Sequence, residues 1–179
     1  MVGTAPNNDI FDYLKYDVFC KKIGAIFPEE FIDYLLLHNN AELDSNIVKI
    51  PNNEINIRYF YGICSQSRTD MESTYEIYKS RLPSKCIPIA EDDLGNQICM
   101  SLSAKTYGKI YFFDHEIIDS DKKEVNTTSL KDMIFLANSF KNLCTKIEPA
   151  NYDDIPVYSP IQVRWNRFVS WLRTRWNRF

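Results

Sequence analysis

The stretch of residues 86–113 constrains the fold most, because short apolar runs alternate there with sequences typical of turns. Residues 86–90 form an apolar run, residues 91–96 have turn composition, and apolar side chains then recur at every second position over residues 97–102. A second turn follows, and residues 110–113 form another apolar run. A period of two indicates strands, and short turns between strands favour antiparallel neighbours. We therefore predict a β-meander in this part of the chain.

Two helices are predicted before the meander. Residues 9–24 have helical periodicity, with Asp9 able to cap the first turn and Gly24 able to end the last. A second helix restarts at Pro28, carries acidic residues in its first turn and ends near His38. The apolar stripe of the first helix consists of Ile10, Tyr13, Leu14 and Val18.

The remaining elements decide the fold class. Residues 46–63 contain two runs rich in apolar residues around a turn at residues 51–53, which indicates strands. Residues 70–80 are predicted to be a third helix, and residues 129–147 a final helix with Ser129 as its cap. Strands and helices do not alternate regularly, as a doubly wound parallel sheet requires. We predict an α+β fold, with helices packed on one face of a mainly antiparallel or mixed sheet.

The net charge of −3 conceals an uneven distribution. Residues 161–179 hold five arginines and no acidic residue, which leaves 16 basic against 24 acidic residues in the rest of the chain. An acidic body argues against nucleic acid as a partner, because binding phosphates requires clustered lysines and arginines.

Five cysteines are scattered without paired spacing, which favours free thiols in a reducing compartment. Only two histidines are present, and potential metal ligands do not cluster, so neither a metal nor a cofactor is predicted. The N-terminal sequence lacks the basic and apolar segments of a secretory signal, and no apolar stretch approaches the ~18 residues of a membrane span. A cytoplasmic protein is expected.

The order of these elements and four short motifs resemble the SUKH superfamily. The motifs are Phe27-Pro28-Glu29-Glu30-Phe31 leading through Tyr34-Leu35 to His38-Asn39-Asn40; Ile87-Pro88-Ile89-Ala90 with Asp92, Gly95-Asn96 and Ile98; Gly108 through Ile110-Tyr111-Phe112-Phe113 to Asp114-His115-Glu116; and the terminal segment with Phe135 and Phe140. The similarity covers about residues 9–147. It implies a non-catalytic binding module, because members of this family serve mostly as immunity proteins that neutralise secreted nuclease or deaminase toxins.

The resemblance implies a cognate toxin as the protein partner. The alternative is a regulatory scaffold or interaction protein, associated with a membrane through its basic aromatic C-terminal helix, because relatives of this family serve as cell-wall regulators. An enzyme is not expected, since no nucleophile is paired with a base and no P-loop or zinc-protease motif occurs. The sequence leaves the identity of the partner and the oligomeric state open.

Two polar clusters need interpretation. Asp92, Asp93, Gly95 and Asn96 favour a turn, although paired carboxylates can also serve acid–base chemistry. Asp114 and His115 resemble a catalytic pair, but neighbouring strand residues point to opposite faces, which favours a role in ending the strand.

Acidic residues form the candidate partner-binding set. This set is either a solvated face or a surface that mimics phosphate and docks on a basic toxin active site. Its members are Glu72, Glu76, Glu91, Asp92, Asp93, Asp114, Glu116, Asp119 and Asp121.

The C-terminal segment repeats Arg-Trp-Asn-Arg-Phe at a spacing of eleven, close to three helical turns. We expect residues 1–148 to form the SUKH-like domain, residues 149–160 a proline-containing linker, and residues 161–179 an amphipathic tail. The tail either packs on the acidic body, contacts an anionic membrane surface or partner, or is an appendage without an evolved role. The residues predicted to make such contacts are Arg164, Trp165, Arg167, Phe168, Trp171, Leu172, Arg175, Trp176 and Phe179.

Overall fold

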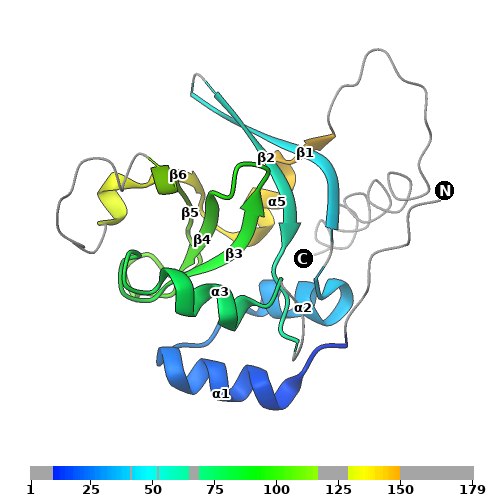
Figure 1. Ribbon diagram of the computed structural model, residues 1–179, viewed down its shortest axis with the longest axis vertical. Coiled ribbons are helices and arrows are strands. Elements are labelled where there is room, and N and C mark those ends of the chain that lie inside the picture. Colours follow the sequence, from blue (N-terminus) through cyan, green and yellow to red (C-terminus); the bar gives the residue numbers. More distant parts are fainter. Residues whose placement is uncertain (1–9, 41, 52, 65–68, 117–128, 150–179) are drawn as a thin grey trace.

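The computed structural model describes residues 10–40, 42–51, 53–64, 69–116 and 129–149 (Figure 1). Within them, seven strands form one sheet in the order β6-β5-β4-β3-β2-β1-β7, and every pairing is antiparallel. The strands are β1 (Glu42–Ile50), β2 (Asn53–Phe60), β3 (Cys86–Asp92), β4 (Gln97–Ser101), β5 (Ile110–Phe113), β6 (Ile134–Ala137) and β7 (Glu148–Pro149). The helices are α1 (Tyr13–Ile23), α2 (Glu29–His38), α3 (Met71–Tyr78) and α5 (Phe140–Lys146), with a 3-10 turn, η1, at Leu130–Asp132.

The predicted β-meander is confirmed as β3, β4 and β5. Glu91 on β3 pairs with Gln97 on β4, which in turn pairs with Phe113 on β5. The register between β3 and β4 shifts between Pro88 and Ala90. A proline has no N–H to give to a ladder, so a central strand accommodates it at such an irregularity.

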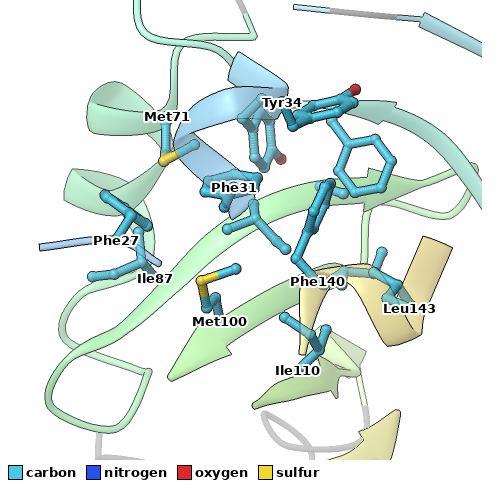
Figure 2. Packing of buried hydrophobic residues seen from close by; sticks show 14 of the residues in the cluster. Phe27, Phe31, Tyr34, Met71, Ile87, Met100, Ile110, Phe140 and Leu143 are labelled. Atoms are coloured by element: carbon cyan, nitrogen blue, oxygen red, sulfur yellow. The ribbon is translucent and has the colours of Figure 1, made fainter. Parts of the chain in front are cut away.

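The main hydrophobic core lies on one face of the sheet, under α1, α2 and α5. Figure 2 shows Phe31 and Tyr34 of α2 and Phe140 of α5 meeting over the strands. The Phe31 and Phe140 ring centroids are 4.8 Å apart in an edge-on arrangement. Full burial of one such ring stabilises the fold by about 1.5–3 kcal/mol.

A smaller cluster occupies the opposite face, because successive strand residues point to opposite sides. Cys99 and Phe113 pack there with Leu82, which follows α3, and with Met133, which follows η1. Tyr78, at the end of α3, also packs against this cluster. The α+β fold is thus confirmed: helices form one layer, and the other face is covered only in part by the described residues.

The prediction of a single helix over residues 129–147 is wrong. Ser129 caps only the turn η1, residues 134–137 pair with β5 as β6, and a new helix starts after Ser139. A short apolar run can be a strand or part of a helix, and here the available edge of β5 selects the strand. The Ser139 side chain then caps α5 by accepting a bond from the Asn142 N–H at 3.1 Å.

The first helix exists, but its predicted start and buried side are wrong. It begins at Tyr13 and is capped by Asp12, whose carboxylate accepts a bond from the Lys15 N–H at 3.0 Å. Ile10 and Leu14 are 91% and 81% exposed. The side of α1 that carries Phe19 and Ile23 faces the core instead, and Tyr13 and Val18 are exposed as well.

Candidate binding surface

A carboxylate held by two tyrosines stands at the centre of the candidate surface. Glu91 on β3 lies beside Tyr59 on β2, whose hydroxyl donates to Oε1 at 2.7 Å. The Tyr61 hydroxyl lies 2.9 Å from Oε2 of Glu91 and 2.8 Å from Oε1 of Gln97. Burial raises the pKa of both tyrosines most; the next contribution is the hydrogen bond to Glu91 for Tyr59 and the charge of Glu91 for Tyr61. Both hydroxyls therefore stay protonated at neutral pH and hold the carboxylate in one orientation.

Arg81 borders this carboxylate group on the side of α3. Its guanidinium carbon lies 5.4 Å from the ring centroids of both Tyr78 and Phe113. Its Nη2 donates to the carbonyl oxygen of His115 at 3.2 Å. The Arg81 cation is therefore stacked and hydrogen-bonded to the end of β5, which fixes its position.

The β3–β4 turn separates two adjacent aspartates into different environments. Asp92 is 5% exposed, and its carboxylate accepts bonds from the N–H groups of Leu94 and Asn96 at 2.9 and 2.8 Å and from the Asn96 amide at 2.9 Å. Asp93 is exposed and contacts the Asn56 side chain, and Leu94 beside it is 79% exposed. Asp92 thus holds the turn, as turn chemistry predicted, while Asp93 and Leu94 face outward.

The end of β5 joins the same turn through His115. Its N–H donates to Oδ1 of Asn96 at 3.2 Å, and its Nδ1 lies 2.8 Å from the same oxygen. Since Oδ1 is an acceptor, the hydrogen bond requires the proton on Nδ1. Asp114 accepts a bond from the N–H of Glu116 at 3.0 Å. These contacts end the strand locally and bring Asp114 and Glu116 to the same end of the sheet as Asp93.

We call this region the tyrosine–carboxylate surface. It combines tyrosines, carboxylates and a stacked arginine from β2, α3, β3 and the ends of β3 and β5. Its residues are Tyr59, Tyr61, Tyr78, Arg81, Glu91, Asp93, Asp114 and Glu116.

Comparison with known proteins gives the family. The model of the SMI1 / KNR4 family (SUKH-1) matches residues 16–145. The chain belongs to this family. It is also 30% identical over 145 residues to the SPbeta prophage-derived uncharacterized protein YokK of Bacillus subtilis (strain 168), over 77% of this chain and 68% of that protein. The resemblance to the SUKH superfamily is thereby confirmed, and the whole tyrosine–carboxylate surface falls inside the SUKH-1 match.

The rest of the predicted acidic set lies elsewhere on the SUKH-1 domain or outside the described residues. Glu72 and Glu76 of α3 form ion pairs with Lys22 of α1 at 3.0 and 2.6 Å, and Glu76 also pairs with Lys79. Their charge is therefore partly neutralised between two helices. Asp119, Asp121 and the nine tail residues predicted to make contacts lie outside the described residues.

Sequence reasoning missed the tyrosines and Arg81 of this SUKH-1 surface, and the buried Gln97 that contacts Tyr61 beneath it. Tyr59 and Tyr61 were predicted only as strand residues, and the register shift between Ile57 and Tyr59 is what brings their hydroxyls to Glu91. The available signal was the turn itself: Glu91 and Gln97 flank it and face the same side because they pair.

Away from this surface, a hollow of about 690 Å³ lies between the C-terminal half of α1 and the loop after β4. Tyr16, Cys20, Lys85 and Tyr107 are among its lining residues. Burial raises the pKa of the Cys20 thiol and, beyond the usual range, that of the Tyr16 hydroxyl. A thiol that stays protonated is a poor nucleophile, so this hollow does not present an activated cysteine.

Among the described residues, no group of three or more histidines, cysteines or carboxylates is placed to bind a metal ion. Of the helices described, none is long and apolar enough to cross a bilayer.

Proposed function

We propose that this SUKH-1 protein is a non-catalytic immunity protein that neutralises a cognate secreted toxin of nuclease or deaminase type by direct binding. The family includes immunity proteins, which supports the proposal. The observation that carries it is Glu91, a carboxylate fixed by Tyr59 and Tyr61 next to the exposed Asp93 and Leu94. This surface, rather than the complete acidic set, is the proposed contact.

The chemistry of the surface fits a basic protein partner. An enzyme that acts on nucleic acids needs a cationic site, and opposed charge accelerates association with such a site. Tyrosines lose little side-chain entropy on binding and are enriched at the centres of interfaces. Glu91 is already oriented by its two hydroxyl donors, so binding does not have to order it.

Two arginines lie in the same region and reduce its net negative charge. Arg81 is engaged with Tyr78, Phe113 and the backbone, and Arg58 lies 5.8 Å from the Tyr59 ring centroid. Four carboxylates still outnumber these two cations. Guanidinium groups stack favourably on aromatic faces, which supports an arginine-bearing partner for this surface.

Growth rescue tests the proposal. The protein is co-expressed with any secreted-toxin domain that is found to be encoded beside its gene, and binding of the two purified proteins is titrated at several salt concentrations. Asp93→Lys with Glu116→Lys should weaken binding roughly tenfold or more and reduce its salt dependence, because two favourable charges become repulsive. The matched control is Glu29→Lys with Asp33→Lys, at exposed positions of α2. Equal affinity of both double variants would refute this interface, and an absent rescue by the wild type would refute immunity.

We further propose that the protein acts in the cytoplasm. None of the five cysteines, Cys20, Cys64, Cys86, Cys99 and Cys144, forms a disulfide in the structure, which suits a reducing compartment. A cytoplasmic immunity protein meets its toxin where the toxin would act.

A regulatory scaffold is the second candidate, and the exposed face of α1 favours it. Leu14 and Val18 of α1 are apolar, lie four residues apart and are exposed, and Ile10 just before the helix is exposed too. Leu14→Ser with Val18→Ser should leave toxin rescue intact if the first function holds. Loss of a cellular phenotype in this variant, together with no effect of the wild type on the toxin, would favour the scaffold.

A further inference from the structure

We infer that residues 161–179 are an internal ligand of the tyrosine–carboxylate surface, so that in the free protein the chain's own basic tail covers the face that carries Glu91 and Asp93. The inference concerns the isolated protein and does not rest on the proposed toxin. Three observations carry it: the position where the chain leaves the sheet, the length of the segment that follows, and the complementary chemistry of the two parts.

The chain leaves the sheet at Pro149, which lies in the same cross-strand row as Asp92 at the start of the β3–β4 turn. Pro149 on β7 lies opposite Asn46 on β1, Asn46 lies opposite Ile57 on β2, and Ile57 lies opposite Asp92 on β3. Figure 1 shows β7 beside β1 at the edge of the sheet. Three strand spacings separate Pro149 from the turn, which is about 14 Å.

The connecting segment is long enough to cross that distance. Residues 150–160 comprise the eleven positions between β7 and the tail. Eleven residues span at most about 36 Å when extended, so the tail can reach the surface with slack in the connection. Tethering at this range corresponds to an effective concentration on the order of millimolar, which makes even weak contacts populate the bound state.

The chemistry of the tail complements that of the surface. The tail offers five arginines and three tryptophans and has no acidic residue. The surface offers Glu91, Asp93, Asp114 and Glu116 beside the partly exposed Tyr59 and Tyr78, and a guanidinium group is already stacked on each of these two rings. Arginine binds carboxylates through paired donors and also stacks on aromatic faces. On α2, by contrast, the exposed carboxylates of Glu29 and Asp33 belong to no such group of tyrosines.

The covered surface would have a regulatory consequence. A partner that binds through the same carboxylates has to displace the tail, so its apparent affinity equals its intrinsic affinity multiplied by the fraction of molecules in which the surface is open. Removal of residues 161–179 should therefore strengthen binding of a basic partner.

Intrinsic fluorescence tests the inference cleanly, because all three tryptophans of the chain, Trp165, Trp171 and Trp176, lie in the tail. Acrylamide quenching is measured for the full-length chain and for the free peptide 161–179. The full-length tryptophans should be quenched several-fold less than those of the peptide at low salt, and the difference should shrink as salt is raised. Equal quenching of chain and peptide would overturn the inference.

Variants locate the contact on the surface. Asp93→Lys with Glu116→Lys should weaken tail docking roughly fivefold, as expected for exposed charge pairs, and return quenching toward that of the peptide. Glu29→Lys with Asp33→Lys should leave quenching unchanged. Both positions of the first variant are exposed, and circular dichroism verifies that each double variant is folded. The same quenching in both variants would overturn the assignment to this surface.

Two further outcomes also count against the inference. Protection that increases with protein concentration would show that the tail docks on a second copy. Tryptophans that behave like the free peptide until vesicles of phosphatidylserine and phosphatidylcholine are added would assign the tail to an anionic membrane instead.

Discussion

Asp92 and Asp93 are identical neighbours with different roles, and hydrogen-bond geometry separates them. Asp92 accepts three bonds inside the β3–β4 turn, whereas Asp93 is exposed and touches the Asn56 side chain. Composition alone identified a turn but could not show which carboxylate remained available to a partner. At the residue scale, the function of a side chain here is decided by whether its oxygens are already occupied.

Replacing each aspartate in turn tests this division. Asp92→Ala should lower the free energy of unfolding by about 2–4 kcal/mol, because buried donors lose a charged acceptor. Asp93→Ala should change it by less than about 0.5 kcal/mol, as surface replacements usually do. Urea denaturation measures both values, and comparable losses in the two variants would contradict the proposed roles.

Tyr61 gives the fold a pH dependence in the alkaline range. Its hydroxyl is buried, and burial followed by the Glu91 charge raises its pKa in the folded state above the ordinary value near 10. Above pH 10 the unfolded chain loses this proton while the folded chain keeps it, so stability is retained below pH 10 and lost as pH rises.

Tyr61→Phe should make that alkaline loss less steep by about 1.4 kcal/mol per pH unit, which is the contribution of one proton. Urea denaturation between pH 9 and about pH 11 measures the slope. An unchanged slope would show that this tyrosine does not keep its proton in the folded state.

At the element scale, the apolar segment of residues 134–146 is divided into an edge strand, β6, and a helix, α5. Residues 134–137 pair with β5, and Lys146 of α5 donates to the carbonyl oxygen of Leu136 at 2.6 Å. Ser139 between them starts the new helix. The two phenylalanines of the segment therefore differ in burial: Phe140 lies in the main core, while Phe135 is half exposed.

These phenylalanines form a matched pair of probes. Phe140→Ala should lower the free energy of unfolding by about 3–5 kcal/mol, because it leaves a cavity among Phe31, Tyr34 and Phe60. Phe135→Ala should have a much smaller effect, limited to its contact with Tyr111. Thermal and urea unfolding report both, and the reverse order of effects would mean that the division into β6 and α5 is wrong.

At the scale of the whole molecule, ion pairs tie α1 to α3 at two levels of burial. Lys15 lies 2.8 Å from Asp70, which is 2% exposed and also caps α3 by accepting bonds from Ser73. Lys22 contacts Glu72 and Glu76 at the surface. The buried pair fixes the first helix against the domain, whereas solvent screens the exposed one.

Removing each lysine tests this difference. Lys15→Met should lower the free energy of unfolding by about 3 kcal/mol, since it leaves the buried Asp70 charge without its cation. Lys22→Met should have a much smaller effect that disappears at high salt. Chemical denaturation at low and high salt distinguishes the two, and equal effects would show that burial does not govern these pairs.

The sequence by itself determined the elements whose signals are local. The meander of β3, β4 and β5, the bounds of α2 and the helix at α3 follow from apolar periodicity and turn residues a few positions apart. The SUKH resemblance rested on the same local motifs. Residues 149–160 and 161–179 remain predictions as linker and tail.

Only the tertiary structure decided which surfaces were available to each element. It turned the exposed stripe of α1 away from the core, converted residues 134–137 into β6, and placed Tyr59, Tyr61 and Tyr78 around Glu91. Each outcome depends on partners distant in sequence, whose positions no local pattern encodes.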